Sequence, residues 1–480
     1  MNRCVKFNEK GKLLTVLIIS LLGLFCFSCY TSPLYPNHFG YDSAIFSLLG
    51  KGIAQGKDLY VDLFDHKGPI IFFINALGHL LGGRNMIFLI QCVSIVITVS
   101  FLFCAGKLLL KKNKYSSFLE LIFPFSGFFT MFLFTFQKGN LTEEYSLPFI
   151  SGCCYMFVKY TIGIKDKPEH PVSYAFFYGV ALAFVVLLRL NNAVTIGAGI
   201  LYIFICLLIN KKYKNLLYNL LVGLLGMAVV VVPIFLYFYV HNSLDEMIYA
   251  TFIHNFIIAD NTAHSSSVVL PYIPMVICMV ILGWKILKSR VIDNIDAILA
   301  IILVLNLTAL LIANRFAHYF EIFTPVYFLF LCRYVNPRKE VVFTAVIILS
   351  VLLNTYQAAE ETISSFKSVY VNGNVRYLTV SEDMAKIPED ERDSVIGFEI
   401  QSADYLSGNI VPCYKYYTLQ NTWSITNPEI VNDFVTYLND ETPVWFIMSK
   451  DHTNEEIGEI VKEKYNFQFE NKYMTFYRLK

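Results

Sequence analysis

Long apolar stretches recur along most of this chain of 480 residues and constrain its fold more than any other feature. A helix needs about 20 mainly apolar residues to cross the hydrocarbon core of a bilayer. Only 16% of the residues are charged, against about 25% in a typical soluble domain. The chain is therefore predicted to be a polytopic α-helical membrane protein. The apolar stretches lie at residues 13–30, 69–106, 117–137, 145–162, 171–188, 193–209, 217–240, 268–286, 294–312, 317–333 and 340–357.

The second stretch, residues 69–106, is too long for one straight crossing. It is interrupted by Gly82-Gly83-Arg84-Asn85, and paired glycines are typical of a helix break. We therefore expect a short interfacial or re-entrant helix followed by one full span. On this interpretation the chain crosses the membrane about eleven times.

Lysine and arginine residues set the expected orientation, because cytoplasmic loops of membrane proteins are enriched in them. If residues 69–106 make one net crossing, all six basic segments fall on one side; two crossings there would break the pattern. The chain is thus expected in the cytoplasmic membrane, with its N-terminus cytoplasmic and its C-terminus outside. The basic segments are 1–12, 107–114, 159–167, 211–214, 285–290 and 333–339.

Residues 358–480 differ in composition from the rest of the chain, since their apolar runs are short and acidic residues outnumber basic ones. Alternating apolar runs predict strands at 395–400, 444–449 and 474–479. Helical periodicity appears at 428–438 and 454–465. We expect a transmembrane domain over 1–357 and a soluble, extracytoplasmic α/β domain over 358–480.

Several functional classes are disfavoured by the sequence. The net charge is +1, and there is no basic patch with interleaved aromatic residues, so nucleic acid is not an expected partner. Phosphate-loop, nucleotide-fingerprint and zinc-spacing motifs are absent from the sequence. The 11 cysteines lie mostly in apolar stretches, where cysteine behaves as a small hydrophobic residue.

The first segment expected outside, residues 31–68, carries an unusual group of charged residues next to a predicted span. Asp42 lies in GYDSAIF, and Asp65, His66 and Lys67 lie in FDHKGP, before Pro69. Ionisable residues held at a membrane commonly serve a functional site. The alternatives left open are a helix-capping role for the aspartate and a lysine that reaches the interface beside its paired aspartate.

Two further outer segments carry charges at the ends of predicted spans. Glu143 and Glu144 are adjacent carboxylates, which suit sugar hydroxyls or a metal ion, unless Thr142 and its neighbours form a capping box. Arg189 and Asn191 interrupt an apolar hairpin. An arginine there needs a partner, and a structural ion pair is the simpler explanation.

A third segment combines Arg315, His318 and Tyr319 within five residues. Arginine and histidine suit a phosphate or pyrophosphate group. An aromatic belt at the membrane interface would explain the tyrosine without a binding role. The segment 241–261, with His254, is most simply a surface loop.

In their order along the chain, these motifs resemble the GT-C superfamily of membrane glycosyltransferases. The resemblance covers roughly residues 10–335 and is strongest to protein mannosyltransferases and lipid A aminoarabinose transferases. Asp42 matches the aspartate of the first outer loop, and His66-Lys67-Gly68-Pro69 resembles the lysine-proline motif of that family. Two features depart from the family pattern. Gly68 separates the lysine from the proline, and two glutamates stand where one aspartate is expected.

The resemblance implies transfer of a hexose or pentose from a polyprenyl-phosphate carrier to a glycan, lipid or protein acceptor, with inversion at the sugar. Asp42 is then expected to be the general base. Cationic groups are expected to bind the phosphate of the donor; they are Lys67, Arg315, His318 and Arg189. Sugar or acceptor contacts are expected from Asp65, His66, Glu143, Glu144, Asn191 and Tyr319. This reaction requires no cofactor or metal, although it is compatible with a bound divalent metal.

Two other functional classes compete with this interpretation. A flippase for lipid-linked saccharides would also hold charges at membrane depth, but transporters tend to show repeated halves, and no repeat is visible here. A polysaccharide polymerase or ligase would use a related donor. A receptor would need few polar residues within its spans. The sequence leaves the sugar, the acceptor and the carrier length open.

Overall fold

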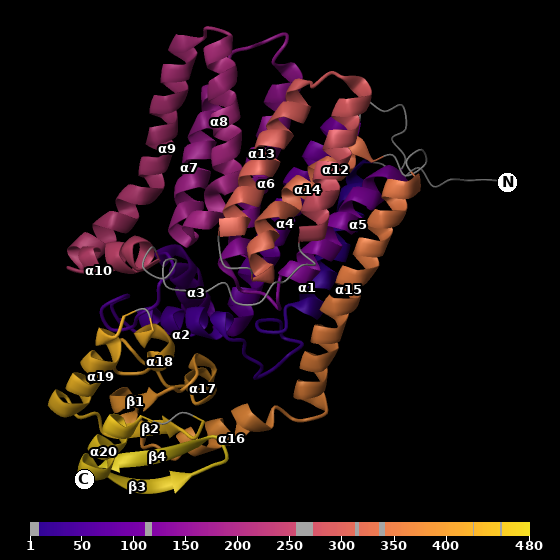
Figure 1. Cartoon of the computed structure of the whole chain (residues 1–480). Coiled ribbons are helices and arrows are strands. Elements are labelled where there is room, and N and C mark those ends of the chain that lie inside the picture. Colours follow the sequence, from indigo (N-terminus) through magenta and orange to yellow (C-terminus); the bar gives the residue numbers. More distant parts are fainter. Residues whose placement is uncertain are drawn as a thin grey trace. The chain divides into compact units, whose positions relative to one another are not determined.

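A computed structural model gives the fold of the chain, which is mainly helical (Figure 1). It describes residues 9–110, 118–255, 272–312, 316–335, 341–425, 427–451 and 454–480. The chain forms two compact units. Unit 1 consists of Met1–Ser28, Leu89–Leu236 and His264–Thr362, and unit 2 consists of Cys29–Phe88, Tyr237–Ala263 and Ile363–Lys480.

Unit 1 is built from the apolar helices. Their bounds are α1 (Glu9–Phe27), α4 (Arg84–Leu110), α5 (Phe118–Thr135), α6 (Thr142–Gly163), α7 (Val172–Leu188), η1 (Leu190–Ala193), α8 (Val194–Ile209), α9 (Tyr213–Val240), α12 (Tyr272–Ser289), α13 (Asn294–Ile312), η3 (Ala317–Phe323), α14 (Thr324–Tyr334) and α15 (Val341–Tyr370). Helices α4, α9 and α15 each continue from one unit into the other.

These helices confirm the apolar stretches as helical segments, and α13 has the predicted bounds. Within the described part of the chain, 6 helices are long and apolar enough to cross a membrane. The chain is therefore a multi-pass membrane protein, while the count of about eleven crossings stays a prediction.

The helix break within residues 69–106 occurs where the sequence predicts it. Helix α3 (Pro69–Leu81) has 13 residues, fewer than a crossing needs, and α4 has 27. Gly82 and Gly83 connect them with φ angles of 141° and 79°, which glycine adopts at little cost. Pro69 occupies the start of α3, where its missing N–H is not needed.

Two helices depart from the predicted bounds. The stretch 317–333 begins as the 3₁₀ segment η3, and α14 starts only at Thr324, next to Pro325. Helix α15 continues to Tyr370, well past the apolar stretch, because Gln, Ala and Glu are good helix formers even when polar. The expected domain boundary at 357/358 thus falls inside a helix, and the division into domains stays a prediction.

Unit 2 combines short helices with a small sheet. Its helices are α2 (Asp42–Ala54), α3, α10 (Leu244–Ile248), η2 (Tyr249–Ile253), α16 (Val375–Met384), η4 (Glu389–Ser394), α17 (Ser402–Ser407), α18 (Gln420–Ser424), α19 (Glu429–Asp440) and α20 (Glu455–Lys464). Its strands are β1 (Val395–Phe398), β2 (Trp445–Ser449), β3 (Tyr465–Glu470) and β4 (Met474–Leu479).

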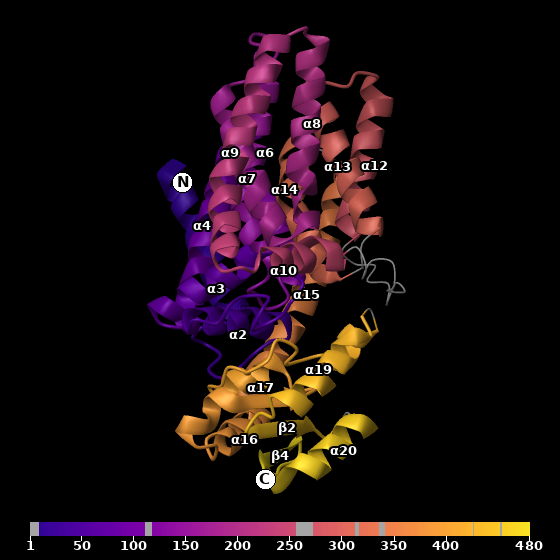
Figure 2. The ribbon, with the colours of Figure 1, turned by 90° about the vertical axis from the view of Figure 1, so that its left-hand side faces the viewer.

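The sheet has the order β1-β2-β4-β3, with β1 and β2 parallel and the other pairs antiparallel. Helices α16, α17, α19 and α20 surround it (Figure 2). The three predicted strands and both predicted helices of this segment are confirmed as elements. Strand β3 was not predicted, because its alternation follows directly on α20 without a turn signal. An extracytoplasmic location of this segment stays a prediction.

The C-terminal segment packs against the first loop segment within unit 2. Asn374 donates from Nδ2 to the carbonyls of Pro36 and Asn37 at 3.1 and 2.9 Å. The Nζ of Lys51 on α2 donates to Asn409 Oδ1 at 2.7 Å. These contacts make residues 29–88 and 363–480 one packed body rather than a loop beside a free domain.

A buried ion-pair network ties α12, α13 and α14 together in unit 1. The carboxylate of Asp296 is 2% exposed and lies 2.7 Å from Lys285 Nζ and 3.2 Å from an Nη atom of Arg333. Tyr334 Oη donates to the same carboxylate at 2.8 Å. Arg333 also pairs with Asp293, just before α13, so two carboxylates balance two cations contributed by two other helices.

Replacing Asp296 by alanine is expected to destabilise the protein by about 3–5 kcal/mol, because Lys285 loses its carboxylate and Arg333 keeps only that of Asp293. Thermal unfolding in detergent would report the change. The matched control is Glu169→Gln, which breaks an exposed pair with Lys212 and is expected to cost less than about 1 kcal/mol. Equal effects of the two substitutions would contradict the network's role.

Candidate functional site

The first candidate group lies in unit 2 and begins with Asp42, the first residue of α2. The charge of Asp42 and that of Lys67 both act on Asp65, whose carboxylate is 2% exposed. Burial raises the pKa of Asp65, Lys67 opposes this rise, and Asp42 adds to it. The structure thus brings Asp42, Asp65 and Lys67 into one electrostatic group, as the sequence predicts.

Local hydrogen bonds fix the shape of the loop that carries this group. Asp65 Oδ1 accepts from the backbone N–H of Lys67 at 2.9 Å, and Lys67 Nζ lies 2.6 Å from His66 Nε2. A lysine ammonium only donates, so His66 Nε2 accepts in this contact. Tyr60 Oη donates to the carbonyl of Lys67 at 2.7 Å, and Asn255 Nδ2 to that of His66 at 2.7 Å. Side-chain hydrogen bonds to the backbone carbonyls of His66 and Lys67 therefore fix both residues in place.

A cavity of about 140 Å³ lies beside the start of α2. It mixes apolar and polar walls, and Tyr41 and Ile45, on either side of Asp42 in the chain, both line it. From the C-terminal segment, Gln401, Ser402 and Thr418 also line it. A cavity lined by a few polar groups suits a small hydroxylated molecule.

The alternative that Asp42 merely caps a helix receives little support. Within the described residues, the N-cap position of α2 is occupied by Tyr41, which makes no capping hydrogen bond through its side chain. Burial, together with the charges of Asp42 and Glu399, raises the pKa of Tyr41 to about 12. Glu399, which sequence reasoning did not select, therefore belongs to the surroundings of Asp42.

Aromatic side chains enclose the same loop within unit 2. His254 is fully buried, and its ring centroid lies 5.4 Å from that of Phe64 and 5.6 Å from that of Trp423. Trp423 also contacts His66, at 5.1 Å between centroids. The expectation of a plain surface loop around 241–261 is therefore wrong for His254, because the packing is set by residues distant in sequence.

The pH dependence of stability provides a test of this packing. Burial first, and the charge of Lys67 second, lower the pKa of His254 to about 4. An unfolded histidine titrates near 6.5, so stability present above pH 6.5 is lost as the pH falls towards 4. His254→Phe is expected to reduce the loss between pH 7 and pH 5 by about 2 kcal/mol. Unfolding profiles with identical pH slopes for both proteins would contradict it.

The second candidate group lies in unit 1 around Glu143, at the start of α6. Arg189 Nη1 lies 2.8 Å from Glu143 Oε1, and the Arg189 guanidinium lies 3.7 Å from the centre of the Tyr319 ring. Thr142 Oγ1 donates to the other Glu143 oxygen at 2.9 Å. The sequence analysis left open a structural ion pair for Arg189, and this pair is present in the structure.

Glu144 holds the loop that precedes α6. Its Oε2 accepts from Gln91 Nε2 at 2.7 Å and from the backbone N–H of Asn140 at 2.9 Å. The loop is strained at Gln137 and Lys138, whose φ angles are 44° and 75°, whereas Gly139 and Asn140 tolerate their φ angles of 90° and 63°. Strain of this kind persists only where the surroundings enforce it.

The remaining predicted residues divide into three cases. His318 is buried, and its Nδ1 lies 2.8 Å from Gln137 Oε1, beside the strained loop. Asn191 is exposed on η1, whereas its neighbour Asn192 is buried and donates to Ser146 Oγ at 3.0 Å. Arg315 lies outside the described residues.

Sequence reasoning missed two charged residues as candidates, one buried and one half-buried. Glu321 on η3 is fully buried, and it interacts electrostatically with Glu143 and Glu144. In the described part of the chain neither of its carboxyl oxygens has a hydrogen-bond partner. In unit 2, Arg84 donates to the carbonyls of Tyr30, Cys29 and His38 at 2.7, 3.2 and 3.3 Å. No local pattern marks either residue.

Metal ligation has limited support from side-chain placement. Among the residues that the structure describes, no group of three or more His, Cys, Asp or Glu side chains could hold a metal ion. The expectation that no metal is required, with a divalent metal still compatible, stays a prediction.

Comparison with known proteins identifies both a sequence family and a fold. Residues 5–344 match the family described as "Putative competence-induced protein Ccs4 N-terminal domain". No curated protein sequence matches the chain.

Two crystal structures of ArnT from Cupriavidus metallidurans resemble the chain over 98% of both proteins at 12% identity. The TM-score is 0.65 for ArnT bound to undecaprenyl phosphate and 0.62 for the apo state. The apo oligosaccharyltransferase of Archaeoglobus fulgidus matches with a TM-score of 0.50 and 10% identity, over 98% of this chain and 74% of that one. The predicted GT-C fold is confirmed.

Proposed function

We propose that this chain, which belongs to the family of competence-induced protein Ccs4 N-terminal domains, is a membrane glycosyltransferase. Its donor is a sugar linked to polyprenyl phosphate, and its acceptor is a glycan, lipid or protein. The single observation that carries the proposal is the grouping of Asp42, Asp65 and Lys67 in unit 2. A carboxylate next to a lysine supplies both a proton acceptor and a phosphate ligand.

The reaction is a direct displacement. The acceptor hydroxyl attacks the anomeric carbon as Asp42 removes its proton, and the bond between that carbon and the phosphate oxygen breaks. Both electrons of the broken bond leave with the polyprenyl phosphate, and Lys67 balances the developing negative charge. A single displacement inverts the sugar and needs no covalent enzyme intermediate.

The other predicted residues have secondary roles in this proposal. His66 and Asp65 position Lys67 through the contacts described above. Arg189 is already paired with Glu143, so donor phosphate would have to compete with that carboxylate for the guanidinium. Glu143, Glu144, Asn191 and Tyr319 are proposed to contact the sugar or acceptor, and Arg315 and His318 the phosphate.

The proposed location is the outer face of the cytoplasmic membrane. It follows from the basic segments that are expected on the cytoplasmic side. The N-terminus is then cytoplasmic, and residues 358–480 are extracytoplasmic. The fold similarity supports the class of enzyme, whereas the sugar and the acceptor have to be found by experiment.

Sugar transfer by the purified full chain in nanodiscs tests the proposal. The assay would supply a panel of radiolabelled polyprenyl-phosphate hexoses and pentoses with membrane-derived acceptors, with and without a chelator. Transfer from one donor, with inversion at the anomeric carbon, is the expected result. The absence of transfer from every donor, together with movement of labelled lipid across liposomes, would instead establish a transporter.

A further inference from the structure

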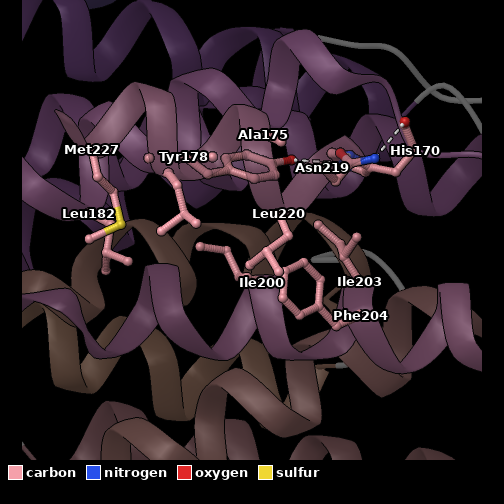
Figure 3. Close-up of a pocket in the computed structure, with 13 residues that line it drawn as sticks. His170, Ala175, Tyr178, Leu182, Ile200, Ile203, Phe204, Asn219, Leu220 and Met227 are labelled. Atoms are coloured by element: carbon pink, nitrogen blue, oxygen red, sulfur yellow. Dashed lines mark hydrogen bonds between the residues drawn. The ribbon is translucent and has the colours of Figure 1, made fainter. Parts of the chain in front are cut away.

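A cavity of about 160 Å³ lies in unit 1 between α7, α8 and α9 (Figure 3). Its walls are mainly aliphatic and aromatic. Its volume is close to that of an engineered apolar cavity of about 150 Å³ that binds benzene. Residues of the apolar wall include Leu182, Ile200, Ile203, Phe204, Leu220 and Met227.

One end of this cavity is polar, but its polar groups are already engaged. Figure 3 shows His170 and Asn219 at one end and Leu182 and Met227 at the other. His170 Nδ1 lies 2.6 Å from Asn219 Oδ1, and Asn219 Nδ2 donates to the His170 carbonyl at 3.2 Å. Burial lowers the pKa of His170 to about 4, so the ring is neutral at neutral pH. An occupant of the cavity therefore needs to be apolar rather than charged.

The wall formed by α9 faces away from the protein interior. Within an apolar stretch of 18 residues in α9, only 6% is buried inside the protein. Leu220 and Leu224, which line the cavity, are 43% and 51% exposed. In contrast, α7 and α9 touch through their backbones, since a Cβ on Gly179 would lie 1.9 Å from the carbonyl oxygen of Gly223. A chain from the bilayer can thus enter past the two leucines.

Positive charge gathers at the polar end. A second hollow shares His170 with the cavity, and its lining includes Lys167, Lys212, Asp166 and Glu169. Lys212 pairs with Glu169 at 2.9 Å, and Lys167 is exposed. The two loops there, residues 165–169 and 211–214, contain five lysines against Asp166 and Glu169. The charges of the lining itself balance, and the excess positive charge belongs to the two loops around the hollow, on the face that the sequence predicts to be cytoplasmic.

We propose that this cavity and hollow form a binding site for an anionic glycerophospholipid of the adjacent leaflet. A segment of one acyl chain, about the size of benzene, occupies the apolar cavity between α7, α8 and α9, and the phosphate lies beside Lys167 and Lys212. This combination explains why an apolar cavity with engaged polar groups adjoins two lysine-rich loops. Each lysine near a membrane surface attracts anionic lipid by about 1 kcal/mol, or on the order of fivefold in affinity per lysine.

Photo-crosslinking of the full chain in nanodiscs tests this site. The nanodiscs would contain unlabelled phosphatidylcholine and a small amount of a lipid with a photoactivatable group on one acyl chain, which is phosphatidylglycerol in one sample and phosphatidylcholine in a parallel one. We expect adducts on residues that line the cavity, with Leu224→Trp reducing them to background by filling its entrance. The matched control is Leu225→Trp, on the same helix and 59% exposed but outside the cavity lining.

The headgroup is tested with the double variant Lys167→Gln and Lys212→Gln. It is expected to lower the phosphatidylglycerol adducts on the order of tenfold or more, with phosphatidylcholine adducts unchanged. Equal labelling of wild type and Leu224→Trp, or no preference for the anionic lipid, would overturn the proposal. Adducts that are removed by excess polyprenyl phosphate but not by excess phosphatidylglycerol would also overturn it, in favour of the carrier lipid as occupant. None of these measurements depends on sugar transfer.

Discussion

Replacing Asp42 by asparagine is expected to lower the rate of sugar transfer by about 10²–10⁴-fold, the usual contribution of a general base. Asparagine has nearly the same shape but cannot accept the proton of the acceptor hydroxyl. The loss should appear in kcat with little change in KM for the donor, because Asp42 acts on the acceptor. Steady-state assays with the donor identified in the panel would measure both constants.

A second aspartate of the same loop provides the matched control. Asp58 carries a partly exposed carboxylate, 2.7 Å from His241, and does not belong to the Asp42 group. Asp58→Asn should keep near wild-type transfer. Thermal unfolding and monodisperse elution would establish that both variants are folded. An Asp42→Asn protein that retains more than about a tenth of the activity would contradict the role of general base.

Much of the fold could be predicted because membrane helices can be recognised from the local amino-acid composition. Apolar length alone located α13, and the glycine pair located the break between α3 and α4. The end of α15 could not be predicted in this way, since its last turns are polar yet still helical. Strand β3 could not be predicted either, since it follows α20 without a turn signal and its first residue, Tyr465, fell within the helix predicted at 454–465.

The site was predictable only in part, because its components are brought together by contacts distant in sequence. Asp42 and Lys67 are charged residues next to apolar spans, and this difference from their neighbours was enough to select them from the sequence. Glu399, His254 and Trp423 reach the surroundings of that loop only through tertiary packing. Glu321 could not be selected for a different reason. It is a single carboxylate in the apolar and aromatic segment η3, where it forms no periodic pattern.

Replacing Lys67 by alanine is expected to reduce transfer by about 10²–10³-fold, the usual cost of removing one group that stabilises developing charge. The structure gives the physical reason. The backbone of Lys67 is fixed by Asp65 and Tyr60, and its ammonium, 2.6 Å from His66 Nε2, is held in place before substrate arrives. Such a preorganised charge costs no reorganisation when the phosphate departs.

The separation of kcat from KM would distinguish this role from simple attraction of an anionic donor. An effect mainly on kcat supports stabilisation of the leaving phosphate, whereas an effect on KM alone would show uniform binding and contradict it. Lys67→Arg keeps the charge but changes its shape, so partial recovery of kcat is expected. Lys57→Ala, in the same loop, is the matched control and should leave both constants near wild type. If Lys57→Ala lowered transfer as much as Lys67→Ala, the positive charge of the whole loop would be the active feature and the specific role of Lys67 would be wrong.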